Sequence, residues 1–402
     1  MKKYLCMIIP LLIVLSLFGC VSNDVLHTEI KTTNTLSMEM IAVEAGDSFS
    51  FAIDANNNLW AWGDNSAGQI GDGTLTEFEE RSHSHEPWII SVDNNRHRPI
   101  KVMESVASVS AGFNHTMAIT TDGSLWAWGS GLLGDGTIGS NHTPVKIMDD
   151  VASVSAGFGY TLVIKTDGSL WAWGMNTSGQ LGDGTGGHGR YSKNTPVKIM
   201  DDVVYVSTGF SHSMAITADG NLWAWGWNNN GQIGDGTRRG DRHSPVIIMG
   251  DVASVSAGTY HTMAITTDGS LWGWGANWNG ELGDGTVDTR KWNEDEGFWF
   301  FENRPTPTKI MDSVAAVSVS HSHTMAIMKD GSLWAWGDGY GASPAKIMDS
   351  VTMVSTGLHT IVLDADGSVW TWGRNRFGEL GDGTTSDRSF PVRIIYSAKL
   401  SE

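Results

Sequence analysis

The sequence predicts an all-β fold, a seven-bladed β-propeller with four antiparallel strands in each blade. The first observation is that the motif W-x-W-G recurs seven times, at spacings of 36 to 66 residues. The second is that four strand-like segments recur with each copy of the motif. Repeats of this length are typical of arrays whose units bury their apolar faces against each other. The motifs begin at Trp60, Trp126, Trp171, Trp223, Trp272, Trp334 and Trp370.

The four segments of one unit read P-V-K-I-M-D, V-A-S-V-S-A-G, H-T-M-A-I-T and D-G-S-L-W-A-W-G. Val109 and Ala111 alternate with Ser108 and Ser110, and this period of two is typical of a half-buried strand. An Asp-Gly pair precedes the tryptophan segment in units two to seven. Such pairs supply the positive φ that a two-residue hairpin needs, so the last two segments are expected to form a hairpin.

The order of the segments predicts how the ring closes. The P-V-K-I segment precedes units two to seven, but no equivalent precedes unit one, and a seventh copy ends the chain at residues 391–395. We expect this C-terminal strand to complete blade one. That pairing would remove the open sheet edges that favour aggregation.

The two tryptophans of each motif lie on the same face of their strand, because side chains two apart point the same way. Burial between blades would contribute about 4 to 6 kcal/mol for each, as an upper bound. The chain has only two cysteines, Cys6 and Cys20. Cys6 lies in the leader, so no disulfide is expected and the core alone must stabilise the fold.

The N-terminus predicts export. Lys2 and Lys3 precede an apolar run over residues 5–18, which is typical of a secretory signal and too short to span a bilayer comfortably. The run ends in Leu17-Phe18-Gly19-Cys20, which resembles the lipobox of bacterial lipoproteins and implies cleavage before a lipidated Cys20. The alternative is an ordinary cleaved signal with an incidental cysteine.

These boundaries divide the chain into a signal peptide (1–19), a flexible tether (20–38), the propeller (39–396) and a tail (397–402). Lipidation would anchor the chain to the outer face of the cytoplasmic membrane or to the outer membrane of a bacterium. The formal net charge is -18, and it becomes -20 once Lys2 and Lys3 are removed. Such a body repels phosphates, so we expect no nucleic acid partner and membrane contact only through the lipid.

The residues S-x-G-x-x-H-T-M-A-I followed by D-G-S-L-W-x-W-G-x-N-x-x-G-Q-L-G-D-G-T resemble the repeats of the regulator of chromosome condensation family, over residues 40–395. The resemblance implies a seven-bladed propeller and a binding surface, as in β-lactamase inhibitor protein II, a secreted relative similar in compartment that binds a partner protein through one face. Unit six has lost the G-Q-L-G-D-G-T loop, unit two has shortened it, and units one and five are expanded after it. We therefore expect one uneven face.

Two sets of repeated polar residues invite metal hypotheses. Five histidines share one repeat position, with Phe49 and Tyr160 in units one and three, and aromatic replacement favours packing over ligation. The aspartates of the G-D-G-T loops lack the spacing of a D-x-D-x-D-G calcium loop, and capping of their own turns explains them more simply, although calcium stays open. We expect no metal site and no cofactor. The two sets are His115, His212, His261, His323 and His359, and Asp72, Asp135, Asp183, Asp235, Asp284 and Asp382.

The residues that break the repeat are the candidate partner-binding residues, because large aromatic side chains often anchor interfaces. They lie in the loops after W-x-W-G, and a local cap over the ring is the alternative role. No nucleophile elbow, H-E-x-x-H motif or P-loop occurs, so we expect no catalytic residue and no enzyme. The candidates are Trp88, Trp278, Trp292, Phe298, Trp299 and Phe300.

The function predicted from these observations is a monomeric, surface-displayed module that binds a protein or a component of the cell envelope. Exposed tryptophans beside acids also suit sugars. The alternative function is therefore cell-wall or carbohydrate binding, with glycan hydrolysis as its enzymatic form.

Overall fold

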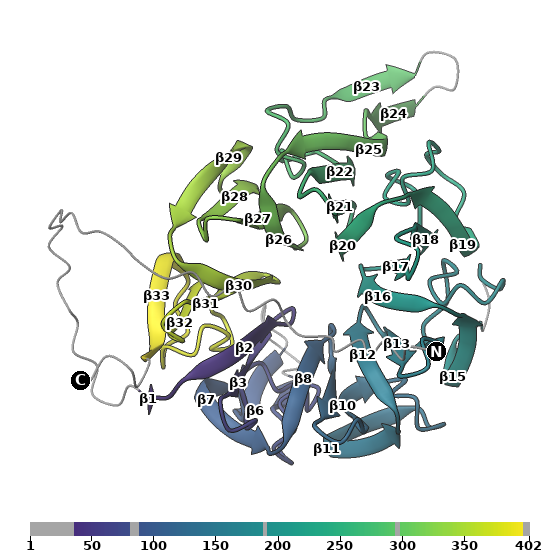
Figure 1. Ribbon diagram of the computed structural model, residues 1–402. Coiled ribbons are helices and arrows are strands. Elements are labelled where there is room, and N and C mark those ends of the chain that lie inside the picture. Colours follow the sequence, from purple (N-terminus) through teal and green to yellow (C-terminus); the bar gives the residue numbers. More distant parts are fainter. Residues whose placement is uncertain (1–35, 81–87, 188–190, 294–297, 397–402) are drawn as a thin grey trace, which may run out of the picture. The chain divides into compact units, whose positions relative to one another are not determined.

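The computed structural model describes residues 36–80, 88–187, 191–293 and 298–396. These residues form seven antiparallel sheets of four strands each, arranged as blades around a ring (Figure 1). The predicted all-β, seven-bladed fold is thereby confirmed. Over the same residues, no helix is long and apolar enough to cross a membrane. Residues 1–35, which include Cys20, and residues 397–402 lie outside the described residues.

Each blade runs outward from an inner strand at the ring centre to an outer strand at the rim (Figure 1). Blade one comprises β2 (Met40–Ala45), β3 (Phe49–Asp54), β4 (Leu59–Gly63) and β7 (Arg96–Met103). Blade two comprises β8 (Val106–Ala111), β9 (His115–Thr120), β10 (Leu125–Gly131) and β11 (Gly139–Met148). Blade three comprises β12 (Val151–Ala156), β13 (Tyr160–Lys165), β14 (Leu170–Gly174) and β15 (Lys193–Met200). Blade four comprises β16 (Val203–Thr208), β17 (His212–Thr217), β18 (Leu222–Gly226) and β19 (Arg242–Met249).

The remaining blades follow the same order. Blade five comprises β20 (Val252–Ala257), β21 (His261–Thr266), β22 (Leu271–Gly275) and β25 (Arg304–Met311). Blade six comprises β26 (Val314–Val319), β27 (His323–Met328), β28 (Leu333–Gly337) and β29 (Gly341–Met348). Blade seven comprises β30 (Val351–Thr356), β31 (His359–Asp364), β32 (Val369–Gly373) and β33 (Arg388–Tyr396). Two extra hairpins extend blades one and five: β5 (Glu77–Glu80) with β6 (Trp88–Val92), and β23 (Arg290–Asn293) with β24 (Phe298–Phe301).

The predicted closure is wrong. The C-terminal strand β33 pairs with β32 and completes blade seven, whereas blade one is completed by its own β7. The reason is that the P-V-K-I strand turns back to pair antiparallel with the W-x-W-G strand that precedes it, so it ends a unit instead of opening the next one. The N-terminal segment β1 (Leu36–Ser37) adds a short parallel strand to β33, so blade seven carries the fifth strand.

The second tryptophan of each W-x-W-G motif fills the interface with the preceding blade. Trp128 of blade two is fully buried and packs on Phe51 and Ile53 of blade one. Trp62 of blade one packs in the same way on Ile361 of blade seven, so the ring closes through the repeat interface itself. The first tryptophan of each motif is half-buried. The prediction that the tryptophans pack between blades is therefore confirmed.

A ring of side-chain oxygens joins the seven inner strands. In six blades the fifth residue of the inner strand is a serine whose hydroxyl accepts the backbone N–H of the next blade, as when Ala156 N donates to Ser110 Oγ at 3.0 Å. Blade one has Glu44 at this position. Its carboxylate accepts Ala111 N at 3.5 Å and Ser355 Oγ at 3.2 Å, and burial raises its pKa to about 7. The other bonds of the ring are to Ser155, Ser207, Ser256, Ser318 and Ser355.

Candidate interaction face

The segment N-x-x-G-Q-L-G-D-G-T, here called the junction loop, connects the third and fourth strands of a blade and holds the next blade. In blade one it spans residues 65–74, and Asn65 organises it by accepting Ile70 N and donating to Thr74. The carbonyl of Gln69 then accepts the indole N–H of Trp128 at 2.8 Å and the hydroxyl of Thr116 at 2.9 Å, both from blade two. One buried carbonyl thus satisfies two buried donors of the neighbouring blade.

Five of the seven junctions share this arrangement. The apolar residue after the bonded glutamine or glutamate is buried in each of the five loops, as Ile70 is. The four further carbonyls and their indole donors are Gln180 with Trp225, Gln232 with Trp274, Glu281 with Trp336, and Glu379 with Trp62.

Three of the repeated histidines, His212, His261 and His359, strengthen the same junctions. His212 Nε2 lies 2.9 Å from the hydroxyl of Thr262 in blade five, and that hydroxyl donates to the carbonyl of Gln232. Because the hydroxyl has one proton to give, which goes to the carbonyl of Gln232, His212 must donate from Nε2. Burial lowers the pKa of the five histidines, to about 4 for His115 and His323 and to about 3 for His212, His261 and His359.

The aspartates of the junction loops cap their own turns. Asp72 Oδ1 accepts both the backbone N–H of Thr74 at 3.0 Å and its hydroxyl at 2.6 Å, and Arg96 pairs with the other oxygen. These hydrogen bonds lower the pKa of Asp72. The same pair of bonds recurs in the five other loops that keep the aspartate. Within the described residues, no group of three or more His, Cys, Asp or Glu side chains is placed to hold a metal ion.

Two junctions depart from the pattern, and both follow a unit whose loop is short or lost. Trp173 packs against blade two, and its indole nitrogen is buried with no hydrogen-bond partner in the described part of the chain. Trp372 packs against blade six, where residues 338–340 replace the loop, and it donates instead to the hydroxyl of Tyr340 at 2.8 Å. Tyr340 therefore supplies an acceptor in place of the missing carbonyl.

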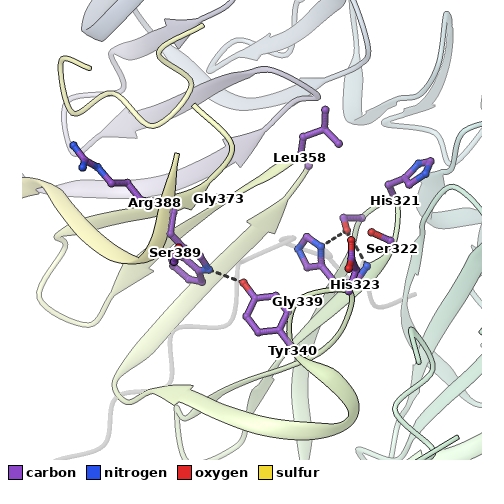
Figure 2. Close-up of a pocket in the computed structure, with 13 residues that line it drawn as sticks. His321, Ser322, His323, Gly339, Tyr340, Leu358, Gly373, Arg388 and Ser389 are labelled. Carbon is purple, nitrogen blue, oxygen red and sulfur yellow. Dashed lines mark hydrogen bonds between the residues drawn. The ribbon is translucent and has the colours of Figure 1, made fainter. Parts of the chain in front are cut away.

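The lost loop leaves a hollow between blades six and seven, here called the blade-six pocket. Its volume is about 440 Å³. Figure 2 shows Tyr340 and His323 on one side of it and Ser389 with Arg388 on the other. The predicted unevenness of one face is therefore found at this junction. The lining residues are Ser320, His321, Ser322, His323, Asp338, Gly339, Tyr340, Gly357, Leu358, Trp372, Gly373, Arg388 and Ser389.

Aromatic side chains extend from this pocket across the same face, which carries the loops after the first and third strands of each blade. Phe158 stacks on Phe210 with ring centroids 4.1 Å apart and contacts Phe113 at 4.6 Å. Phe113 and Phe210 stay 40% and 39% exposed, which is unusual for phenylalanines packed together.

A second group lies over blades four to six. Tyr260 is the central ring, with Trp227 at 5.6 Å, Trp278 at 4.9 Å and His321 at 5.1 Å. Trp278 also contacts Phe301 at 5.5 Å. His321 lines the blade-six pocket, so this group leads into it. We call these eight residues the aromatic arc: Phe113, Phe158, Phe210, Trp227, Tyr260, Trp278, Phe301 and His321.

Of the predicted partner-binding residues, Trp278 lies in the arc, half-buried, and donates to Asn303 Oδ1 at 3.3 Å. The others lie in the two extra hairpins, and only their backbone is described. Trp292 and Trp299 are register partners in the hairpin of blade five, next to the pair Asn293 and Phe298. The remaining candidates are Phe300 in β24 and Trp88 in β6.

Sequence reasoning missed most of the arc. Phe113, Phe158 and Phe210 each stand two residues before the repeated histidine or its tyrosine substitute. Three consecutive units with phenylalanine in a loop position were the available signal. The contacts between them follow from the closeness of neighbouring blades near the ring centre, which a single unit does not reveal.

The comparisons with known proteins agree with this architecture. The RCC1-like domain matches residues 18–343, and the Regulator of chromosome condensation (RCC1) repeat matches residues 366–400. The chain belongs to the RCC1-like domain family. The match covers most of the chain, and the resemblance inferred from the repeats is confirmed.

Curated relatives of this RCC1-like chain include eukaryotic proteins. It is 28% identical over 216 residues to the Ultraviolet-B receptor UVR8 of Arabidopsis thaliana, covering 52% of this chain and 45% of the receptor. It is 26% identical over 237 residues to the human E3 ubiquitin-protein ligase HERC2, covering 54% of this chain and 5% of the ligase. The chain therefore spans less than half the length of these relatives.

Solved structures share the fold of the RCC1-like chain. Human WBSCR16 superposes with a TM-score of 0.70 at 22% identity, covering 84% of this chain and 93% of that one. Prp20p from Saccharomyces cerevisiae superposes with a TM-score of 0.66 at 19% identity, covering 90% of this chain and 88% of that one. At these identities the likeness shows the fold alone.

Proposed function

We propose that this RCC1-like propeller is a non-catalytic, protein-binding module that is exported and held at a bacterial membrane surface by a lipid on Cys20. The observation that carries the binding role is the aromatic arc. Two groups of partly exposed aromatic rings, one over blades two to four and one over blades four to six, form a pre-organised surface, and such anchors dominate protein interfaces.

Relatives support a binding role for this scaffold. The yeast protein Prp20p is described by its binding properties to Gsp1p and histones, and yeast RCC1 (Prp20) also occurs bound to Kap60. For the present chain the partner is a protein or envelope component on the outer side of the membrane. The acidic net charge of -18 favours a partner with a complementary basic surface.

The binding role is tested by affinity capture from cell envelopes and culture fluid, with partners identified by mass spectrometry. Replacing Phe158 and Tyr260 with Ala should lose the captured partner at least about tenfold, because each is the central ring of its group. Phe390→Ala is the matched control, since Phe390 is 78% exposed on the outer strand of blade seven. Equal capture by the arc variant and the control would reject the arc as the binding surface.

The same purified chain tested on a glycan array separates protein binding from the carbohydrate alternative. The proposal is supported if no glycan on the array is bound and if capture of a protein depends on the arc. Saturable glycan binding that the Phe158 and Tyr260 variant loses would reassign the arc to sugars.

The lipid anchor is tested by metabolic labelling with an alkynyl fatty acid. The wild-type chain should incorporate the label and sediment with membranes, and Cys20→Ala should not incorporate the label, because it lacks the thiol that carries the lipid. A Cys20→Ala chain that stays labelled and membrane-bound would remove the anchor from the proposal.

A further inference from the structure

The blade-six pocket is a junction that lacks its own loop, and the intact junctions show what normally fills such a space. At the junction of blades one and two, the loop inserts Ile70 as a fully buried side chain and presents the carbonyl of Gln69 to blade two. Blade six has only Asp338, Gly339 and Tyr340 in this place. A hollow of about 440 Å³ remains after Tyr340 has bonded Trp372, and this volume is sufficient for a specific ligand.

In two of the five intact loops, the residue at the entry of the loop pairs with the side chain that precedes the buried aliphatic residue. In blade one, Asp64 Oδ2 accepts the side-chain amide of Gln69 at 3.0 Å. In blade seven the same two positions hold Arg374 and Glu379, paired at 3.7 Å. In these two loops an acid accompanies glutamine and a base accompanies glutamate, as charge complementarity favours. The entry residues of the other three intact loops, Met175, Trp227 and Ala276, carry no charge.

Asp338 is the blade-six counterpart of Asp64, since each directly follows the glycine of W-x-W-G. Its exposed carboxylate lines the pocket, and no hydrogen bond to it occurs within the described residues. His323 also lines the pocket, and its Nε2 is buried without a partner in the same described ranges. The pocket therefore keeps a carboxylate that can accept the side-chain amide of a glutamine. It also keeps a buried ring nitrogen of His323 that has no hydrogen-bond partner within the described residues.

We propose that the blade-six pocket binds a tight Gly-Gln-Leu-Gly or Gly-Gln-Ile-Gly turn donated by another polypeptide, which completes the junction as the chain's own loops do elsewhere. The inference rests on the proposed function, because it names the chemistry by which the loop face recognises a protein. A second folded copy of this chain is not the donor, since its five intact junction loops are already buried in their own junctions.

The test is isothermal titration of the full chain with a cyclised peptide of the sequence of residues 65–74, Asn-Ser-Ala-Gly-Gln-Ile-Gly-Asp-Gly-Thr. Saturable one-to-one binding is expected. Replacing the peptide's glutamine with glutamate should weaken binding on the order of tenfold, because two carboxylates would then face each other. Replacing its isoleucine with aspartate should abolish binding.

Two variants of the chain make the test specific. Asp338→Arg should invert the preference, so that the glutamate peptide binds more tightly, as the pair of Arg374 and Glu379 indicates. Grafting residues 64–74 in place of residues 338–340 should fill the pocket and abolish binding of both peptides. Thermal melting followed by circular dichroism verifies that both variants fold.

No binding of the glutamine peptide to the wild-type chain, or an unchanged preference in Asp338→Arg, would overturn the proposal. Capture of a protein through Phe158 and Tyr260 would be unaffected by that result, because it does not depend on the pocket. The failure of the pocket and the failure of the proposed function are therefore distinguishable.

Discussion

The junction between blades one and two and the junction between blades six and seven are built from the same repeat but differ in one element. In the first, the carbonyl of Gln69 joins Trp128 and Thr116 across the junction. In the second, the loop is absent, the hydroxyl of Tyr340 accepts Trp372, and a pocket opens beside it. The difference teaches that the junction loop joins neighbouring blades, and that losing one loop leaves an open pocket at the interface.

The largest expected effect is acid destabilisation, because it acts on several junctions together. The folded chain holds five histidines neutral with pKa values of about 3 to 4, whereas unfolded histidine titrates near 6.5. The unfolded state therefore binds more protons below pH 6.5. The free energy of unfolding should fall as pH drops from about 6.5 to 4, by up to about 1.4 kcal/mol per pH unit for each histidine.

Four carboxylates oppose this trend. Burial raises the pKa values of Asp47 and Glu379, and raises those of Glu44 and Asp288 to about 7 and about 6, so their contribution to stability is lost as pH rises through the raised pKa values. They are outnumbered by the histidines. Urea unfolding at pH 7.5, 6.5 and 5.5 should show a falling midpoint, and His212→Tyr, which copies the residue of blade three, should flatten the slope. A midpoint that rises on acidification would contradict the role of the neutral imidazoles.

The close approach of an intact loop to the next tryptophan is tested by two glycines. A Cβ on Gly71 would lie 2.6 Å from the indole nitrogen of Trp128, whereas a Cβ on Gly73 would meet nothing nearer than 3.5 Å. Both have φ of +83°, so alanine costs each about 1 to 2 kcal/mol of backbone strain. Gly71→Ala should lower the free energy of unfolding by roughly 2 kcal/mol more than Gly73→Ala in urea titrations. Equal losses would mean that loop and tryptophan are not tightly packed.

The hydrogen bond of the loop carbonyl is isolated by a matched pair of tryptophans. Trp128 and Trp173 are both fully buried at the same repeat position, but only Trp128 donates to a loop carbonyl. Replacing either tryptophan with Phe removes a similar area of buried apolar surface. Trp128→Phe should cost about 1 to 2 kcal/mol more, because it leaves a buried acceptor with one donor fewer, whereas Trp173→Phe removes an unpaired N–H. Chemical unfolding of the two variants measures the difference. A larger loss of unfolding free energy for Trp173→Phe would refute the role of the loop carbonyl in joining the blades.

The smallest effect is expected at the inner ring. Glu44→Ser restores the serine that the other six blades carry, and it should change the free energy of unfolding at pH 6 by less than about 1 kcal/mol. The variant should lose the part of the pH dependence that lies between pH 4.5 and 7. Unfolding curves at pH 5 and pH 8 measure this, and an unchanged pH dependence would show that Glu44 does not titrate in that range.

The blades could be predicted from the sequence because each unit carries its own strands, turns and interface tryptophan. The boundary between consecutive units could not be predicted, since a periodic pattern does not mark where one unit ends. The strand at residues 391–395 was therefore assigned to the wrong blade. The change from serine to Glu44 was visible by aligning the units. The stacking of Phe158 on Phe210 and the contact of Tyr260 with Trp278 depend on the packing of whole blades and loops.

The central claim is that the loop face bearing the arc and the blade-six pocket contacts a partner protein. Site-specific photocrosslinking tests it directly, with benzoylphenylalanine placed at Phe158, at His321 and at Phe390 in cells that produce the full chain. The account predicts the same discrete adduct from Phe158 and His321 and none from Phe390. Adducts from Phe390 alone, or no adduct from either loop-face position, would contradict it.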